Sequence, residues 1–150
     1  MPVYDPDLNL NLALGDRYKS ETQKARVISE AWTEINAFCC SCGGTLTRGQ
    51  NNARVLDFTC VKCDNEFELK STRGNFSTKI PDGAFRAMMA RLSDASSPDF
   101  FFLTYDVKSS RVTNFFAIPT YFLDATVIEK RKPLSPQAMR AGWVGCNIVM

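Results

Sequence analysis

The sequence predicts an α/β fold. Three observations favour this class. Apolar residues recur at helical spacing from Ser20 to about Phe38, and two runs in which apolar and polar residues alternate follow within the stretch 54–72. Further along, the run F-F-F-L-T-Y at 100–105 is typical of a strand buried on both faces. Helical and strand patterns thus share one short chain, and the alternating runs flank a cysteine pair.

Length and composition fit a single soluble globular domain: 150 residues, of which 45% are hydrophobic and 23% are charged. No apolar run approaches the roughly 20 residues of a transmembrane helix, and the first residues lack the features of a signal peptide. We therefore expect a protein of the reducing cytoplasm without membrane association, where paired cysteines more often bind metal than form disulfides. Residues 1–16 read as an N-terminal arm with little structure of its own, and 17–150 as the folded domain.

The first helix is expected to begin at a cap formed by Ser20 or Thr22 and to end near Phe38. Its buried face would carry Ala25, Ile28, Trp32 and Ile35.

Glu30 and Glu34 lie one turn apart on this helix. In several nuclease folds such a helix carboxylate supports a metal, but a solvated face is the commoner meaning, so we assign this pair no role.

Two cysteine pairs form the pattern C-x(2)-C-x(17)-C-x(2)-C, whose members are Cys39, Cys42, Cys60 and Cys63. Each pair has the spacing at which two thiolates bind one tetrahedral ion. The chain has no histidine, so such a site is all-cysteine, which suits structural zinc and leaves no open position for catalysis. The alternatives are unrelated buried thiols or two disulfides. We expect the remaining Cys40 and Cys146 to be small buried hydrophobic side chains.

The alternating runs Val55–Thr59 and Glu66–Ser71 predict a β-hairpin around the second cysteine pair. Asp57 then shares a face with Glu68 and Lys70, and one register sets Asp57 opposite Glu68 with Cβ atoms about 4.5–5.5 Å apart.

Carboxylates that close repel unless a cation lies between them, and oxygen ligands favour Mg²⁺ or Mn²⁺. Lys70 could then orient or deprotonate a water that attacks a phosphate. The alternative is an exposed sheet face with ordinary charges, because D-x(10)-E-x-K is a loose pattern.

The second half of the chain begins with a turn-rich stretch at 73–83. A short helix is expected from about Asp82, its cap, to Leu92, with Phe85, Met88, Met89 and Leu92 as its apolar face. The strand at 100–105 is expected to pair with a strand at 112–119, whereas 121–128 fits either a helix or a strand.

Basic residues outnumber acidic ones by six to two between Val107 and Met150. This excess suits a phosphate backbone about as well as a solvated basic face.

The order helix, hairpin, helix, strand, with D-x(10)-E-x-K on the hairpin, resembles the core of the PD-(D/E)XK nucleases. The stretches R-V-L-D-F-T-C-V-K-C-D-N-E-F-E-L-K-S-T, Y-K-S-E-T-Q-K-A-R and R-A-G-W-V-G-C-N-I are similar to the DpnI-type methyl-directed restriction endonucleases. The similarity runs nearly end to end from about Leu10. It implies a mixed central sheet flanked by helices, with a hairpin stapled by zinc on four cysteines.

The resemblance also implies roles for single residues. The family's metal-binding aspartate falls on Asp57, its (D/E)-x-K pair on Glu68 and Lys70, and its zinc ligands on the four paired cysteines. The tryptophan that lies against methylated adenines falls on Trp143. Such enzymes cut duplex DNA at G-A-T-C when the adenine carries an N6-methyl group. They continue into a C-terminal winged-helix domain that a chain of this length does not contain, so we expect either a catalytic-domain fragment or a shorter relative.

We therefore interpret the chain as a Mg²⁺-dependent restriction endonuclease for N6-methyladenine-containing duplex DNA, bacterial or phage-encoded and monomeric. Trp143 would detect the methyl group while Arg131, Lys132 and Arg140 grip phosphates. A non-catalytic reader of methylated DNA and a repair nuclease of the same fold are the alternatives. For Trp143 the competing interpretation is a core residue.

Overall fold

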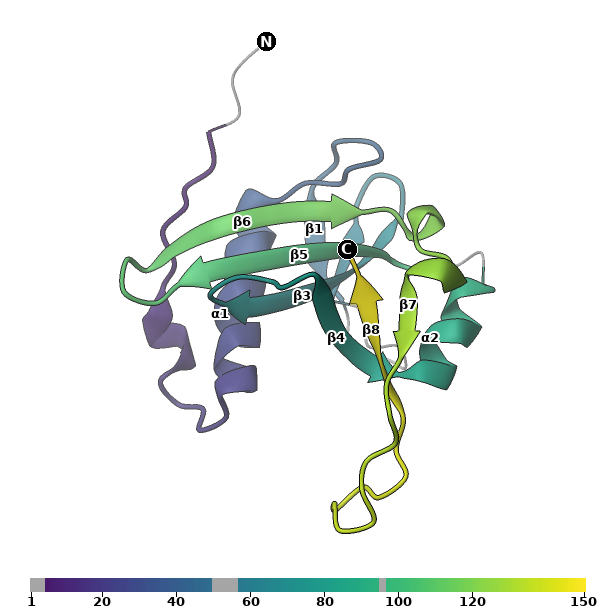
Figure 1. Cartoon of the computed structure of the whole chain (residues 1–150). Helices are drawn as coiled ribbons and strands as arrows, with labels where there is room; N and C mark the ends of the chain where they lie inside the picture. Colours follow the sequence, from purple (N-terminus) through teal and green to yellow (C-terminus); the bar gives the residue numbers. More distant parts are fainter. Residues whose placement is uncertain (1–4, 50–56, 95–96) are drawn as a thin grey trace. The chain divides into compact units, whose positions relative to one another are not determined.

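The computed structural model describes residues 5–49, 57–94 and 97–150 (Figure 1). Contacts divide the chain into two compact units, one of Met1–Asn75 with Pro98–Ile118 and the other of Phe76–Ser97 with Pro119–Met150. The described residues form a mixed α/β protein with two α-helices. None of their helices is long and apolar enough to cross a membrane.

The first unit is built on a mixed five-stranded sheet with the order β1-β2-β3-β5-β6. Neighbouring strands are antiparallel except for β3 and β5, which are parallel. Its elements are η1 (Leu12–Gly15), α1 (Glu21–Asn36), β1 (Leu46–Arg48), β2 (Phe58–Cys60), β3 (Glu66–Arg73), β5 (Asp99–Asp106) and β6 (Arg111–Ile118).

Helix α1 begins where the sequence predicted, because the Ser20 side chain caps it by accepting a hydrogen bond from the Gln23 N–H. Its buried face differs from the prediction. Ile28 and Trp32 are buried, but Ile35 is 82% exposed. Ser29 is fully buried and donates its hydroxyl proton toward the sheet, so the face is centred between Ser29 and Trp32 and Ile35 lies about a quarter turn away from that centre.

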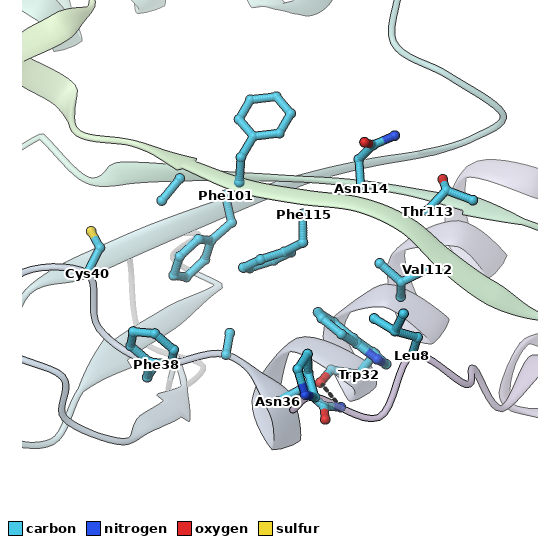
Figure 2. Close-up of a pocket in the computed structure, with 14 residues that line it drawn as sticks. Leu8, Trp32, Asn36, Phe38, Cys40, Phe101, Val112, Thr113, Asn114 and Phe115 are labelled. Atoms are coloured by element: carbon cyan, nitrogen blue, oxygen red, sulfur yellow. Dashed lines mark hydrogen bonds between the residues drawn. The ribbon is translucent and has the colours of Figure 1, made fainter. Parts of the chain in front are cut away.

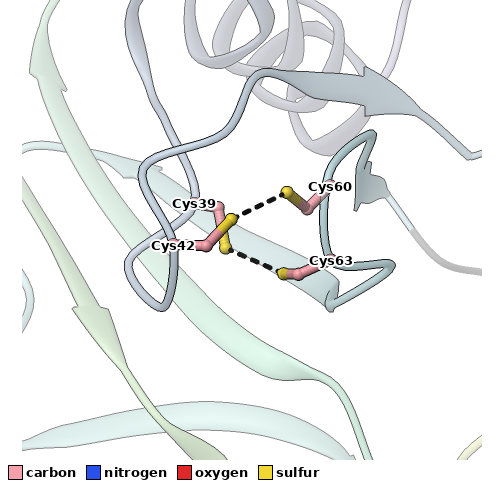
Figure 3. Close-up of side chains that lie close together, drawn as sticks. All are labelled: Cys39, Cys42, Cys60 and Cys63. Carbon is pink, nitrogen blue, oxygen red and sulfur yellow. Dashed lines mark hydrogen bonds between the residues drawn. The ribbon is translucent and has the colours of Figure 1, made fainter.

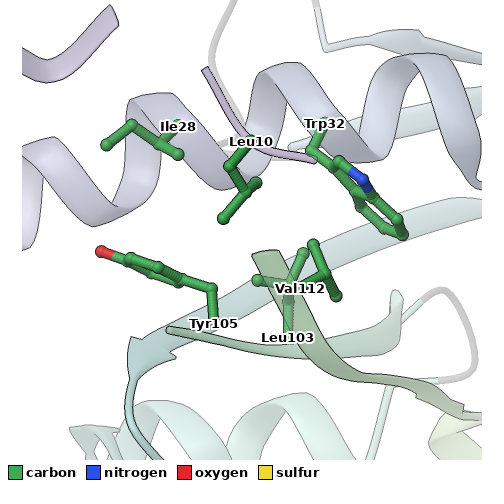
Figure 4. Packing of buried hydrophobic residues seen from close by; sticks show 6 residues of the cluster. All are labelled: Leu10, Ile28, Trp32, Leu103, Tyr105 and Val112. Atoms are coloured by element: carbon green, nitrogen blue, oxygen red, sulfur yellow. The ribbon is translucent and has the colours of Figure 1, made fainter. Parts of the chain in front are cut away.

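The core of this unit fills the space between α1 and the sheet (Figure 4). The cluster consists of Ile28 and Trp32 of α1, Leu103 and Tyr105 of β5, Val112 of β6 and Leu10 from the N-terminal stretch.

The stretch 1–16, expected to have little structure, packs in its described part. Asn9 forms a β-bridge with Arg111, and the indole N–H of Trp32 donates to the Asp7 carbonyl over 2.6 Å. Local sequence did not indicate this packing, because the partner strand β6 lies far along the chain.

The central strands agree with the sequence analysis. Strand β3 covers the predicted run, and β5 is buried along nearly its whole length, as expected of a strand covered on both faces. The predicted neighbour at 112–119 is β6, antiparallel to β5. Of the predicted strand Val55–Thr59, Val55 and Leu56 lie outside the described residues, and β2 begins at Phe58.

The second unit carries a three-stranded antiparallel sheet with the order β4-β8-β7. Its elements are β4 (Lys79–Ala84), α2 (Phe85–Leu92), η2 (Thr120–Phe122), η3 (Ala125–Val127), β7 (Ile128–Lys130) and β8 (Gly145–Val149). Most of 121–128 is therefore 3₁₀ helix rather than α-helix or strand.

Strand β4 contradicts the prediction of a turn-rich segment at 73–83. Pro81 is tolerated because β4 is an edge strand, and Gly83 lies at the bulge between Asp82 and Ala84. Asp82 is consequently a strand residue, and Ala84 rather than Asp82 occupies the N-cap of α2.

Candidate functional site

The four paired cysteines converge at one point of the first unit, with their sulfur atoms all within 4.8 Å of one another (Figure 3). The Sγ atoms of Cys39 and Cys63 lie 3.6 Å apart, and those of Cys42 and Cys60 lie 3.5 Å apart. A disulfide needs about 2.05 Å, whereas tetrahedral zinc with Zn–S bonds of about 2.3 Å separates its sulfurs by about 3.8 Å. The cluster therefore fits a metal such as zinc, as the spacing predicted.

Each cysteine pair lies on a tight turn that aims its two thiols in one direction. The Gly43 N–H donates to the Cys39 carbonyl over 2.8 Å, and the Asp64 N–H donates to the Cys60 carbonyl over 3.0 Å. Backbone N–H groups of Gly44 and Lys62 also point at sulfur, each over 3.4 Å.

At Cys60, hydrogen bonds favour the thiolate form that a metal needs. Burial acts to raise the pKa of the Cys60 thiol, but hydrogen bonds from the backbone of Cys63 and Lys62 outweigh it and lower this pKa to about 7.

The two other cysteines differ from each other. Cys146 is fully buried in the second unit, as expected, but Cys40 is exposed, so its prediction as a buried side chain is wrong. Its neighbour Cys39 is buried and contributes its sulfur to the cluster.

Asp57 lies directly before β2, where the pairing of β2 with β3 ends. The observed register pairs Phe58 with Phe67, and its continuation by one residue puts Asp57 opposite Glu68, one of the registers that the sequence allowed. The Leu69 N–H donates to Asp57 Oδ2 over 2.7 Å. The carboxylate thus occupies the edge of β3 that β2 leaves open.

A chain of charges links Asp57 to helix α1. Arg26 Nη2 lies 3.7 Å from Asp57 Oδ1, while Arg26 Nε donates to Glu30 Oε1 over 2.7 Å. Arg48 approaches the other Glu30 oxygen at 3.8 Å and Glu34 at 2.8 Å. Sequence reasoning assigned no role to Arg26 and Glu30. Their i,i+4 spacing was visible, but their approach to Asp57 depends on the packing of α1 on the sheet.

Burial raises the pKa of the Asp57 carboxyl, and the nearby carboxylates of Glu30 and Glu68 raise it further. The Leu69 N–H and the Arg26 guanidinium act in the opposite direction. The carboxylates of Asp57, Glu30 and Glu68 are thus close enough to repel one another at a half-buried place. A bound cation would reduce this repulsion.

Glu68 and Lys70 follow on β3 with side chains on the same face, opposite to that of Leu69. Glu68 is only 9% exposed and Lys70 is half-buried. Within the described part of the chain, the four cysteines are the group whose ligating atoms lie close enough together to bind one ion. The carboxylate oxygens of Asp57, Glu30 and Glu68 lie farther apart than that.

In the second unit, the four residues predicted to bind DNA lie on or beside the loop between β7 and β8 (Figure 1). Trp143 is half-buried, and the Arg140 guanidinium lies 4.6 Å from the centre of its ring. Gly145 leaves room for the indole, since a Cβ there would lie 2.7 Å from the ring and 3.1 Å from the Arg131 guanidinium. Lys132 is exposed.

The first unit also contains an apolar pocket of about 440 Å³ that no motif predicted (Figure 2). Trp32, Phe101 and Phe115 form much of its wall, and the ring centre of Phe115 lies 5.3 Å from that of Trp32 and 5.1 Å from that of Phe101. None of its lining residues is charged, so it provides no ion pair for a DNA phosphate.

Fold and cysteine cluster together define a mixed α/β protein with a candidate zinc site. The family described as "DpnI: Dam-replacing family" matches residues 7–150, so the chain belongs to this family. Membership indicates interaction with DNA, a function related to DNA methylation, and at most an activity like that of a restriction enzyme.

Proposed function

We propose that the chain is a Mg²⁺- or Mn²⁺-dependent endonuclease that hydrolyses phosphodiesters of duplex DNA containing N6-methyladenine, at methylated G-A-T-C. The observation that carries the proposal is the position of Asp57, whose carboxylate is fixed by the Leu69 N–H at the edge of β3 beside Glu68 and Lys70. Membership in the DpnI family supports the choice of substrate.

The donor set suits a hard divalent cation. Carboxylate oxygens are the ligands that Mg²⁺ and Mn²⁺ prefer, and Asp57 and Glu68 would hold the ion. When bound, the ion supplies a Lewis acid that polarises the scissile phosphate and lowers the pKa of the attacking water. The Arg26 guanidinium partly neutralises Asp57 and Glu30 in the present structure.

Lys70 follows Glu68 by two residues on the same face of β3, about 7 Å along the strand. From there its ammonium group positions the water for attack on phosphorus and opposes the negative charge that develops on the phosphate oxygens.

Zinc has a structural part in this proposal. Cys60 lies three residues after Asp57 and Cys63 three residues before Glu66, so the ion fixes the turn that joins β2 to β3. Phe67 stacks on Phe101 with ring centres 4.4 Å apart and anchors the same hairpin to β5. The register of Asp57 against β3 therefore depends on the cluster. Free thiols at this site are in keeping with the reducing cytoplasm.

Specificity is assigned to Trp143. An N6-methyl group projects into the major groove as a small apolar bump without charge, which an indole detects by contact area. Arg131, Lys132 and Arg140 supply positive charge on the same loop for the DNA backbone.

The test is incubation of the chain with the same plasmid in methylated and unmethylated form, with and without Mg²⁺. We expect cleavage only of methylated DNA in the presence of the ion. Binding of methylated DNA without cleavage would support a non-catalytic reader instead, and cleavage that ignores methylation would support a repair nuclease. Either result would overturn the proposal.

A further inference from the structure

A second, smaller pocket of about 210 Å³ lies in the first unit. Neither the proposed catalytic residues nor the paired cysteines line it. Its wall combines the first turn of α1, through Glu21 and Thr22, with Arg73 at the end of β3 and Tyr105 near the end of β5. Because β3 and β5 are parallel, their carboxyl ends meet at the same edge of the sheet. Ligands of α/β proteins commonly bind outside that edge.

Tyr105 contributes its hydroxyl group to this pocket, and no hydrogen bond within the described residues uses that hydroxyl. The residue is only 4% exposed, and its ring belongs to the hydrophobic cluster of Figure 4, where the hydroxyl points away from Leu103 and Val112. A buried tyrosine hydroxyl usually finds a hydrogen-bond partner. This hydroxyl has no hydrogen-bond partner within residues 5–49, 57–94 and 97–150; it is not shut off from solvent, because it reaches the open space of the pocket.

Charges of both signs lie near the phenol. Burial raises the pKa of Tyr105, the Arg73 guanidinium lowers it, and the Glu21 carboxylate raises it. Arg73 and Tyr105 both line the pocket.

The start of α1 adds further donors. This helix has 16 residues, and its cap is weak, since the Ser20 hydroxyl accepts from the Gln23 N–H at 3.5 Å. The N–H groups of Glu21 and Thr22 meet no acceptor among the residues that the structure describes. Such a helix terminus carries partial positive charge and binds phosphate groups in many proteins.

Glu21 is the one acidic residue of the wall, and it is loosely held. Its carboxylate lies 3.6 Å from Arg73 and 3.4 Å from Lys24, longer than the roughly 2.7–2.9 Å of a strong charge-assisted bond. With 64% of its side chain exposed, Glu21 is free to turn outward when another anion enters.

We propose that this pocket binds a phosphate group, with the Tyr105 hydroxyl, the Arg73 guanidinium and the N-terminal N–H groups of α1 as donors. The phosphate is either part of a DNA backbone or free in solution. Arg73 follows Lys70 by three residues on β3, so the two side chains lie on opposite faces of the strand and the pocket is separate from the proposed catalytic face. The DNA source rests on the proposed function; the phosphate chemistry does not.

The first experiment is a titration of the full zinc-loaded chain with inorganic phosphate, followed by the amide NMR signals of Glu21 and Thr22, with chloride at equal ionic strength as the reference. Tyr105→Phe should weaken phosphate binding about tenfold. Glu21→Gln should strengthen it. Tyr105→Phe should also leave the melting temperature unchanged, because the hydroxyl has no partner in the fold. Tyr121→Phe, an exposed tyrosine of η2, is the matched control and should bind as wild type does.

The second experiment measures the salt dependence of methylated-duplex binding without divalent ions, so that it does not depend on cleavage. If the ligand is a backbone phosphate, Arg73→Gln should lower the slope of log K against log salt by about one. An unchanged slope with intact phosphate binding would overturn the DNA source and leave free phosphate. The absence of phosphate-specific shifts, or equal affinity of Tyr105→Phe and wild type, would overturn the pocket itself.

Discussion

Gly44 offers a sharp test of the cysteine cluster as a metal site, because it has no room for a side chain. A Cβ added there would lie 2.8 Å from Cys60 Sγ, 2.8 Å from Lys62 Cβ and 3.2 Å from Cys42 Sγ. Carbon atoms in contact prefer about 3.5–4.0 Å, so Gly44→Ala must push the two cysteine turns apart. The backbone of Gly44 is outside the positive-φ region, unlike Gly43, so the effect is one of space alone.

Overpacking of this kind costs about 1–3 kcal/mol, which for a chain of this size lowers the melting temperature by roughly 2–12 °C. We expect Gly44→Ala to lose zinc faster to a chelator and to melt earlier. Elemental analysis measures the zinc content at the start, chelator competition the rate of zinc loss, and thermal unfolding the melting temperature. Gly83→Ala is the control, since a Cβ there would meet nothing within 4 Å. A Gly44→Ala protein with one tightly held zinc and wild-type melting would refute the packing of the cluster described here.

Three further predictions concern catalysis, specificity and the core. Asp57→Ala and Lys70→Ala should each lower plasmid cleavage by at least about a hundredfold while binding of methylated DNA in a gel-shift assay stays near wild type; near-normal turnover of Lys70→Ala would remove its assigned role. Trp143→Ala should reduce the preference for methylated over unmethylated duplex by roughly tenfold and keep its circular dichroism spectrum, and an unfolded variant would mark Trp143 as a core residue. Ile28→Ala should lower the free energy of unfolding by about 2–5 kcal/mol in urea, whereas Ile35→Ala should change it by less than about 0.5 kcal/mol.

The cluster of four cysteines shows how much local sequence can predict. The two C-x-x-C turns are separated by only 17 residues, and each presents two thiols at the spacing of one tetrahedral ion. The structure brings all four thiols together, as this spacing predicted. The same holds for β5, whose buried positions 100–105 follow directly from a run that is too short for a helix.

Errors arose where a distant partner decided the outcome. Pro81 and Gly83 are turn residues by local preference, yet they lie in β4 because β8, much later in the chain, offers an edge to pair with. Ile35 fits the helical stripe of α1, yet it faces solvent because the sheet approaches the helix on the side of Ser29.

The candidate catalytic site also contains some residues that the sequence indicated and others that only the structure revealed. The pattern D-x(10)-E-x-K made Asp57, Glu68 and Lys70 candidates and allowed the register that the hairpin adopts, but only the family resemblance favoured them over an exposed face with ordinary charges. It contained no sign that Arg26 and Glu30 approach Asp57, because that contact forms across the interface between α1 and the sheet.

The sequence by itself determined the features that depend on neighbours within a few residues: the cap and length of α1, the hairpin, the cysteine cluster and the buried central strand. Tertiary structure alone decided which face of α1 is buried, that β4 is a strand, and that Tyr105, Arg73 and the start of α1 enclose one pocket. Periodicity records how often a side chain returns to one side of an element. It does not record which other element covers that side, because that depends on the free energy of packing surfaces that are far apart in the chain.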